Sequence, residues 1–366
     1  MKVAFDTRDL ALARTGIRTV LEGLIEAFKD QEVELLLLSP KTVRRPENKF
    51  EKIWEHVRYF FWKEVQLPLT ARSKGAKILF CNDYVVPYFS FGVKTFPFFH
   101  GTNFWEFKAH YNPLWRIYFS LLSLPAAKKS AGVFVNSEFT KLKVNRTLGI
   151  REDKLVVLPL APKPKCNEFN EVALTSLGIK DSEYILHVGV FEKRKNLVNL
   201  IRAFNTLKNK EVKLVLVGQK GPKDSLDDYP RVVNEIETLG LEGRVVLPGH
   251  VNEIDLATFY LNAKLYVFPS FYEGFGIPVL EAFQYDVPVI TSSQGALPEI
   301  VGENGLYFDG TSPINMAQVM DEALEDKALQ ERLLLNGRER LKNFSWALAA
   351  NKMIKVFKEA AGNDKS

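Results

Sequence analysis

The chain has 366 residues, 46% of them hydrophobic and 25% charged, which predicts two or three domains with ample core. Its only two cysteines, Cys81 and Cys166, are too few and too far apart for a disulfide framework or a metal cluster, so we expect free thiols in a reducing compartment. No run of about 18 or more apolar residues and no signal-peptide pattern is present, so we expect a cytoplasmic protein without a membrane-spanning helix.

The first part of the chain alternates strand-like and helix-like runs, which is typical of a parallel α/β domain. It begins with the predicted strand KVAFDT, and Gly16 stands just before the predicted helix IRTVLEGLIEAFKD. Gly16 is either a simple helix-leading glycine or a point where a phosphate or an acceptor approaches the backbone.

The formal net charge of +5 is unevenly distributed. Residues 1–165 hold 27 Lys and Arg against 16 Asp and Glu, whereas the remainder holds 22 against 28, so the first half is expected to meet an anionic partner. Aromatic and basic side chains interleave in residues 44–77. The aromatic ones are Trp54, Tyr59, Phe60, Phe61 and Trp62, and the basic ones include Lys52, Arg58, Lys63, Arg72 and Lys74.

Two interpretations of residues 44–77 stay open. The segment is either an amphipathic surface that lies on anionic lipid, or an ordinary helix whose aromatic side chains pack inward. Nucleic acid is not expected as a partner, because no recognition motif accompanies the charge.

Two polar positions follow later strands of this half. His100 follows the predicted strand TFPFF and precedes an aromatic loop, and a lone histidine is more often structural than catalytic. Ser137, in VFVNSEFTK, lies at a strand-to-helix turn and is predicted to cap the helix.

A proline-rich segment, Pro159 to Asn170, is typical of an interdomain linker. A second series of alternating strands and helices follows it. We therefore expect two doubly wound domains, residues 1–165 and 166–345, facing each other across a cleft, and a helical tail over residues 346–362.

Arg194 and Lys195 lie in the loop FEKRKN, between a predicted strand and a predicted helix. At the carboxyl end of a strand they are suited to grip a diphosphate. The alternative is a solvated basic pair before a helix that Asn196 caps. Gly218 and Gly249 each close a later strand, where they either admit a base close to the backbone or serve as turn glycines.

The most informative segment is FYEGFGIPVLE, which sets Glu273 and Glu281 eight residues apart around a glycine-rich turn. The flanking pattern predicts Glu273 in a loop at the carboxyl end of a strand, where ligands bind in open α/β sheets, and Glu281 about two turns into the next helix. Carboxylates accept hydrogen bonds from adjacent hydroxyls of a sugar or ribose. The alternative is one solvated loop glutamate and one surface helix glutamate.

Backbone amides in the same turn are expected to open the helix and face a phosphate. These are the amides of Gly274, Phe275, Gly276 and Ile277.

The segment SSQGALPEI repeats the glycine turn before a helix one strand further on. The amides from Gly295 to Leu297 are either a second phosphate face or a simple helix start with Pro298 near the first turn. The chain has no Walker pattern, no triple-glycine fingerprint and no Asp-x-Asp pair after an apolar strand. We therefore expect neither a cofactor nor a metal.

Taken together, these segments resemble the retaining family 4 glycosyltransferases of the GT-B fold. The resemblance covers nearly the whole chain and rests on the order and spacing of its motifs. These are GIRTV, FFHGTN, VNSEFTK, VGVFEKRKNL, LVLVG, the glutamate pair and SSQGALPEIVGENGLYF. It implies two Rossmann-like doubly wound domains and a C-terminal helix, in FSWALAANKMIKVFKEA, that crosses back to the N-terminal domain. Two departures are Val190, where many members carry Arg, and PLAPKP, where a PxGVD-like run is common.

The resemblance implies roles for the residues of the second half. Glu281 binds the ribose hydroxyls, and Glu273 holds hydroxyls of the donor sugar with the 274–277 amides near phosphate. Arg194 and Lys195 neutralise the leaving diphosphate. Gly218 and Gly249 are counted with this donor-binding set.

In the first half, the resemblance places His100 at the reacting face of the sugar and Gly16 beside the diphosphate and the acceptor. The implied activity is transfer of a hexose from a nucleotide diphosphate sugar to an acceptor hydroxyl, with retention and without a metal. A donor phosphate oxygen helps to deprotonate the acceptor, and closure of the two domains excludes water.

The RKN loop together with EGFGIPVLEA is similar to mannosyl- and rhamnosyltransferases of polysaccharide assembly, so GDP-mannose is the first choice of donor. The basic, aromatic first half fits a lipid-linked or otherwise anionic acceptor. One alternative is a non-catalytic nucleotide-sugar-binding subunit of a polysaccharide complex. The other is a sugar-nucleotide epimerase, which needs several acid/base carboxylates, and no matching set is present.

Overall fold

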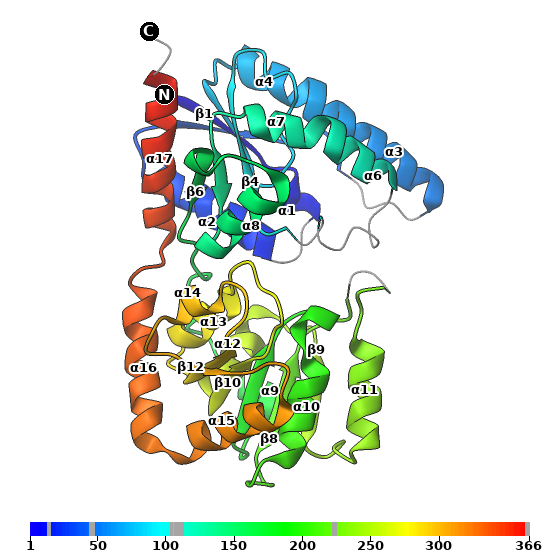
Figure 1. The fold of residues 1–366 in the computed structure, drawn as a ribbon, viewed down its shortest axis with the longest axis vertical. Coiled ribbons are helices and arrows are strands. Elements are labelled where there is room, and N and C mark those ends of the chain that lie inside the picture. Colours follow the sequence, from blue (N-terminus) through cyan, green and yellow to red (C-terminus); the bar gives the residue numbers. More distant parts are fainter. Residues whose placement is uncertain (13–15, 44–47, 103–104, 106–112, 222–224, 363–366) are drawn as a thin grey trace. The chain divides into compact units, whose positions relative to one another are not determined.

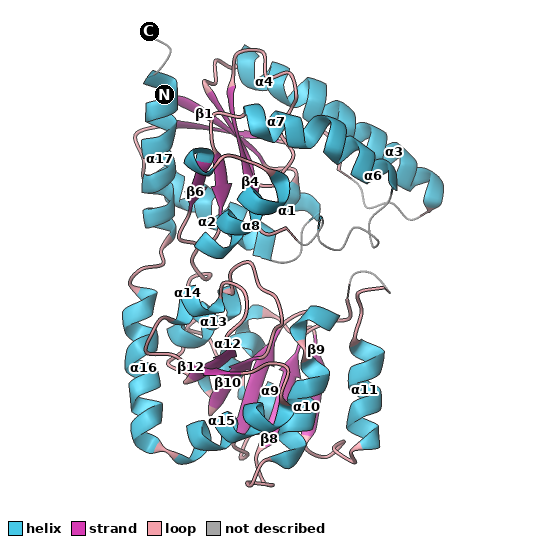
Figure 2. Cartoon of the chain, viewed as in Figure 1, coloured by secondary structure: helices cyan, strands magenta, loops and turns pink. Residues whose placement is uncertain are grey.

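The computed structural model describes residues 1–366 except 13–15, 44–47, 103–104, 106–112, 222–224 and 363–366 (Figure 1). The chain forms two compact units. The first comprises Met1–Ala161 and Phe344–Ser366, and the second comprises Pro162–Asn343. Helices and strands alternate through both units (Figure 2).

The first unit is built on a six-stranded parallel sheet of order β2-β1-β3-β4-β5-β6. The chain turns back beside β1, so the topological switch point lies at the carboxyl ends of β1 and β3. The strands are β1 (Lys2–Asp6), β2 (Glu34–Leu38), β3 (Ile78–Cys81), β4 (Lys94–Phe99), β5 (Val133–Val135) and β6 (Leu155–Val157).

The helices of the first unit connect these strands. They are α1 (Asp9–Leu12), α2 (Gly16–Lys29), α3 (Lys49–Phe61), the π-helical turn η1 (Trp62–Gln66), α4 (Leu67–Ser73), α6 (Pro113–Tyr118), the π-helical turn η3 (Phe119–Ser123), α7 (Leu124–Lys129), α8 (Glu138–Leu148), the 3-10 turn η4 (Glu152–Lys154) and α17 (Trp346–Gly362). Ser137 caps α8 as predicted, since its hydroxyl accepts a hydrogen bond of 3.0 Å from the amide of Thr140.

Helix α17, from the end of the chain, packs on the first unit. Phe357 is fully buried, and its ring lies 4.9 Å from Phe96, 5.7 Å from Phe134 and 6.4 Å from Phe28 of α2. These aromatic contacts, edge-on with Phe96 and Phe134 and tilted with Phe28, join helix and sheet in one core. The expected crossover helix is therefore confirmed.

A buried charge cluster occupies the switch point of the first unit. Lys63, only 2% exposed, places Nζ 2.7 Å from Oδ2 of Asp6 at the end of β1 and 2.8 Å from Oδ1 of Asp83 after β3. Trp62 donates its indole N–H to Asp6 at 3.1 Å. Burial opposes the charge of Lys63, but the two carboxylates outweigh it and raise its pKa. Lys63 and Trp62 therefore do not belong to the basic, aromatic surface predicted for residues 44–77.

The second unit has a six-stranded parallel sheet of order β12-β11-β10-β7-β8-β9, so its switch point lies between the carboxyl ends of β7 and β10. The strands are β7 (Tyr184–Val188), β8 (Lys213–Val217), β9 (Val245–Gly249), β10 (Leu265–Phe268), β11 (Val289–Ser292) and β12 (Leu306–Phe308). The helices are α9 (Glu171–Ser176), the 3-10 turn η5 (Lys193–Lys195), α10 (Leu197–Thr206), α11 (Tyr229–Thr238), α12 (Glu253–Leu261), α13 (Ile277–Gln284), α14 (Leu297–Val301), α15 (Pro313–Glu325) and α16 (Lys327–Leu341).

The main core of this unit lies between its sheet and the helices α10 and α15. Leu197, Leu200, Ile201 and Phe204 recur at helical spacing on α10 and are all fully buried. Met316 and Met320 of α15 belong to the same cluster. The core fixes the strand ends, and hence the loops that follow them. Both cysteines are free thiols, as predicted.

Candidate active site

Two loops meet at the switch point of the second unit. Arg194 and Lys195 lie in η5 after β7, and Glu273 lies in the loop after β10. Nη1 of Arg194 is 2.8 Å from Oε1 of Glu273, and Nζ of Lys195 is 2.6 Å from the same oxygen. Residues that are 78 and 79 positions apart thus form one ion-paired cluster.

Glu192 also belongs to this cluster, and sequence reasoning missed it. Its Oε2 lies 2.6 Å from Nε of Arg194. Two cations therefore face two carboxyl groups. The side chain of Arg194 is 28% exposed and that of Lys195 only 8%, so Arg194 is the cation that an incoming anion reaches. Glu192 lies in the segment FEKRKN, so its closeness along the chain to Arg194 was the available signal.

The electrostatics hold Glu273 as a carboxylate. Burial alone raises its pKa, but Arg194 and Lys195 outweigh burial and lower the pKa to about 2. For Lys195 burial dominates, and its pKa is lowered despite the carboxylate. Its ammonium group also lies 4.6 Å from the centre of the Phe268 ring.

Backbone and side-chain bonds fix the two loops against each other. The amide of Phe271 donates to the carbonyl of Arg194 at 2.8 Å. Asn196 occupies the N-cap position of α10 with a positive φ of 60°, but its side chain makes no capping bond, so that part of the alternative interpretation is wrong. Its amide group instead donates to the carbonyls of Pro269 at 3.0 Å and Gly310 at 2.7 Å. Asn tolerates this left-handed conformation, and here it serves as a cross-link.

The loop after β11 supports Glu273 from the other side. The amide of Ala296 donates to the carbonyl of Glu273 at 3.0 Å. Gly295 has a φ of +66°, and a Cβ there would lie 2.6 Å from the same carbonyl oxygen. The backbone of Glu273 can approach this closely only because Gly295 has no side chain.

We expect Gly295→Ala to lower the rate of transfer by tenfold or more, because the new methyl group must push Glu273 away from its two cations. Gly240→Ala is the matched control, since Gly240 has a φ of +64° with no atom within 4 Å of the Cβ position. Both variants carry the left-handed strain of about 1–2 kcal/mol. Thermal unfolding and initial rates separate the effects, and equal rates in the two variants would contradict the expectation.

The other two glycines of the predicted donor set differ in their surroundings. A Cβ on Gly218, just after β8, would lie 1.8 Å from the carbonyl oxygen of Gly189. Gly218 therefore leaves room for the neighbouring backbone of Gly189. Gly249 ends β9 with a φ of +76° and nothing within 4 Å of its Cβ position, which is the geometry of a turn glycine.

Helix α13 begins directly after the glycine-rich turn. It starts at Ile277, with Gly276 as the N-cap residue, and Pro278 has no N–H to offer. The expectation that the four amides of residues 274–277 open the helix is therefore wrong for Gly274 and Phe275, whereas Gly276 and Ile277 occupy the N-cap and first positions. Gly274 and buried Phe275 belong to the loop that leads from Glu273 to the helix.

Glu281 is the fifth residue of α13, about one turn into the helix and not the predicted two. Tyr260 of α12 donates its hydroxyl to Oε2 of Glu281 at 2.9 Å. Burial raises the pKa of this carboxyl group. Tyr260 thus positions Glu281, and its apolar surroundings in LATFYLNA gave no signal of that role.

The remaining predicted residues lie in the first unit. Nε2 of His100 lies 2.9 Å from the carbonyl oxygen of Asn82, so Nε2 carries the proton and Nδ1 is the acceptor. Burial lowers the pKa of His100 to about 4, so its imidazole is neutral near pH 7. Gly16 is the first residue of α2, and Asn82 donates its side-chain amide to the next carbonyl, that of Ile17, at 2.8 Å.

Among the described residues, no group of three or more His, Cys, Asp or Glu is arranged to hold a metal ion. None of the described helices is long and apolar enough to cross a membrane.

Each unit is a doubly wound domain with a parallel sheet, and the last helix of the chain belongs to the first unit. These features define the GT-B fold. Comparison with known proteins agrees. Residues 171–340 match the family model of glycosyl transferases group 1, and residues 14–161 match that of Glycosyltransferase Family 4. The chain belongs to this family of glycosyltransferases.

Curated relatives include two proteins of Escherichia coli. The chain is 29% identical over 256 residues to O-antigen chain mannosyltransferase B, a match that covers 68% of this chain and 66% of that protein. It is 27% identical over 248 residues to the serotype-specific mannosyltransferase WbdA, covering 65% of this chain and 30% of that protein. Among solved structures it resembles sucrose-phosphate synthase from Thermosynechococcus elongatus, with a TM-score of 0.75, 20% identity, and coverage of 99% and 100% of the two chains.

Proposed function

We propose that the protein transfers a hexose from a nucleotide diphosphate sugar to an acceptor hydroxyl, with retention of anomeric configuration. The cluster of Glu273, Arg194 and Lys195 at the switch point of the second unit carries this proposal. Breaking the glycosidic bond leaves growing negative charge on the diphosphate, and preorganised cations stabilise that charge. The sugar becomes oxocarbenium-like in the same step.

The geometry supports a division of roles within the cluster. Both cations bond to Oε1 of Glu273, and we assign Oε2 to a hydroxyl of the donor sugar. Arg194, the more exposed cation, releases Glu192 and pairs with the diphosphate instead. The buried Lys195 keeps Glu273 in place. Since Arg194 and Lys195 supply positive charge, we propose transfer without a metal or other cofactor.

The other site residues are assigned to other parts of the substrates. Glu281, positioned by Tyr260, accepts from the ribose hydroxyls. His100 offers its neutral Nδ1 to a sugar hydroxyl, and Gly16 lies beside the diphosphate and acceptor. A donor phosphate oxygen takes the proton of the acceptor hydroxyl.

GDP-mannose is the proposed donor, which the two mannosyltransferase relatives support. The proposed acceptor is a lipid-linked or oligosaccharide chain of polysaccharide assembly, reached in the cytoplasm at the inner face of an anionic membrane. The basic excess of the first half supports an anionic acceptor or surface.

A metal-free thermal-shift series with GDP-mannose, UDP-glucose and dTDP-rhamnose tests the donor. A ligand at 100 times its dissociation constant stabilises the protein by about 2.7 kcal/mol, which is roughly a 5–10 °C shift for a unit of this size. We expect GDP-mannose to give the shift. A shift with another sugar nucleotide would reassign the donor, and no shift from a folded protein would overturn the proposal.

A further inference from the structure

Helix α3 is amphipathic in the sense opposite to that of an ordinary surface helix. Its inward side is polar, since Glu55 pairs with Arg8 at 2.8 Å and Tyr59 donates to Asp83 at 3.0 Å. Its outward side is apolar and exposed. Outward residues and their exposed fractions are Phe50 (70%), Ile53 (62%), Trp54 (52%), Val57 (50%), Phe60 (43%) and Phe61 (49%). A helix that meets only water on its outer side places polar residues there.

A second exposed apolar row lies on α6 and η3, beside α3 (Figure 1). It comprises Leu114 (75%), Ile117 (55%) and Leu121 (67%). Ile53, Val57 and Phe60 of the first row and all of the second row line a groove of about 640 Å³, a size typical of small-molecule sites.

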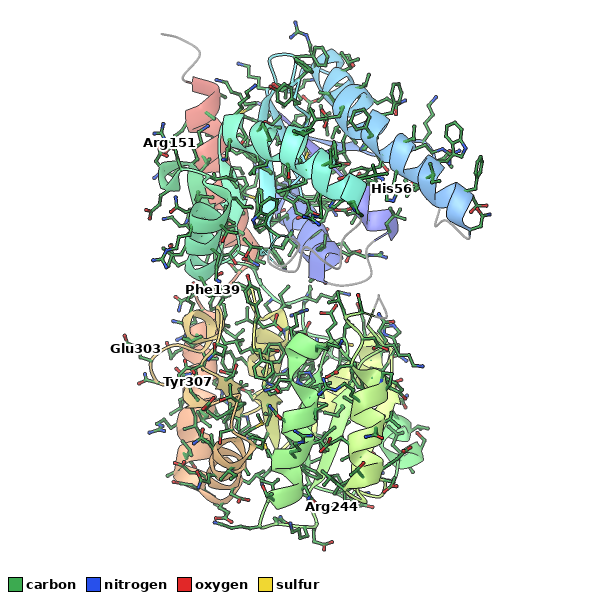
Figure 3. All side chains as sticks on the ribbon, turned by 45° about the vertical axis from the view of Figure 1, so that its right-hand side comes forward. His56, Phe139, Arg151, Arg244, Glu303 and Tyr307 are labelled. Atoms are coloured by element: carbon green, nitrogen blue, oxygen red, sulfur yellow. The ribbon has the colours of Figure 1, made fainter. Side chains whose placement is uncertain are left out.

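The groove is apolar because its polar atoms are bonded inward. Tyr59 and Tyr118 contribute their rings to its lining, while their hydroxyls donate to Asp83 at 3.0 Å and Glu64 at 2.9 Å. His56 on α3, labelled in Figure 3, also lines the groove. This lining suits a hydrocarbon chain.

The charge around these rows identifies the kind of partner. Without the buried Lys63, residues 44–77 carry eight Lys and Arg against four Asp and Glu, and Arg116 of α6 is exposed as well. Arg58 on α3 is 59% exposed and lies 3.9 Å from Glu55, whose other carboxylate oxygen pairs inward with Arg8 at 2.8 Å. Exposed apolar rows with basic side chains are complementary to an anionic lipid surface.

We propose that α3 with α6 and η3 seats the first unit on an anionic phospholipid bilayer, and that the groove between them takes one lipid chain. The outward rows enter the interface, and the exposed arginines meet the headgroups. None of the residues of this surface belongs to the proposed donor site, so we expect docking to be independent of the donor. This surface thereby identifies the residues behind the membrane contact that the proposed lipid-linked acceptor requires.

Flotation with vesicles tests the surface. We expect binding to phosphatidylcholine vesicles with 30% phosphatidylglycerol at low salt, and at least tenfold weaker binding for Ile53→Glu. Leu335→Glu on α16 is the matched control, since Leu335 is 60% exposed but lies in the second unit, and it should bind as the parent does. The donor should raise the unfolding temperature of both variants as much as that of the parent. That result would show that failure to bind vesicles is distinct from failure to bind the donor.

Fluorescence tests the groove. Trp115 lines it, so lipids brominated on their acyl chains should quench part of the tryptophan emission, and Trp115→Phe should remove that part. No vesicle binding by the parent would overturn the proposal, as would equal loss in both glutamate variants. Vesicle binding with no quenching of Trp115 would overturn the chain-binding groove. A dimer in size-exclusion chromatography that Ile53→Glu dissolves would assign the surface to a second copy instead.

Discussion

Replacing Glu273 by glutamine is expected to lower kcat/KM by about 10²–10³-fold, the range found when one preorganised electrostatic contact at a transition state is removed. Glutamine cannot neutralise the two cations that share Oε1 of Glu273. Breaking a buried pair from one side leaves uncompensated charge, so we also expect a loss of about 3 kcal/mol of unfolding free energy. Initial rates and urea unfolding measure the two effects.

Glu235→Gln is the control for Glu273→Gln. Glu235 pairs with Arg202, whose side chain is 51% exposed, on the surface of the same unit. Such a pair contributes at most about 1 kcal/mol to the free energy of unfolding, and its loss should leave the transfer rate unchanged. Full activity in Glu273→Gln would remove Glu273 from the site.

The stability lost in Glu273→Gln should depend on pH. Because the folded-state pKa of Glu273 is lowered from 4.5 to about 2, its ionised form contributes stability that is fully present above about pH 4.5. That contribution is lost as the pH falls through about 2. The difference in unfolding free energy between the parent and the variant should therefore shrink over this range, and a constant difference would contradict the ion-pair assignment.

Replacing Lys63 by methionine is expected to lower the free energy of unfolding by about 3–5 kcal/mol. The change leaves Asp6 and Asp83 at the switch point without their shared cation. Methionine keeps most of the volume of the lysine methylene chain, so the loss of unfolding free energy reports the loss of the positive charge. Urea unfolding measures it. Lys29→Met, which removes an exposed ion pair with Glu26 on α2, should change the unfolding free energy by less than about 0.5 kcal/mol.

The sign of the pH effect at Lys63 is opposite to that at Glu273. The pKa of Lys63 is raised above its ordinary value of 10.5, so its contribution is fully present below about pH 10.5 and is lost as the pH rises through the higher folded-state pKa. Burial raises the pKa of Asp9 to about 7 and Lys63 lowers it, so the penalty of Lys63→Met should grow as the pH rises through about 7. A penalty below 1 kcal/mol would mean that water reaches the two carboxylates.

The fold was predictable because its signals are local. Alternating apolar runs specify parallel strands and connecting helices, and a serine at a strand-to-helix turn specifies the cap at Ser137. The site was partly predictable for the same reason. Glu273, Arg194 and Lys195 each follow an apolar strand, and the carboxyl ends of parallel strands lie at one edge of a sheet.

The tertiary structure alone decided how these groups combine. The sequence by itself determined that Glu273, Arg194 and Lys195 lie in loops at strand ends. It did not determine that β10 lies next to β7, which brings Glu273 onto both cations and lowers its pKa. It placed Lys63 in a basic, aromatic segment, but only the rotation of η1 turns Lys63 inward, while α3 turns Trp54 outward. Strand order and helix rotation follow from packing over the whole core, and no local pattern in the chain encodes them.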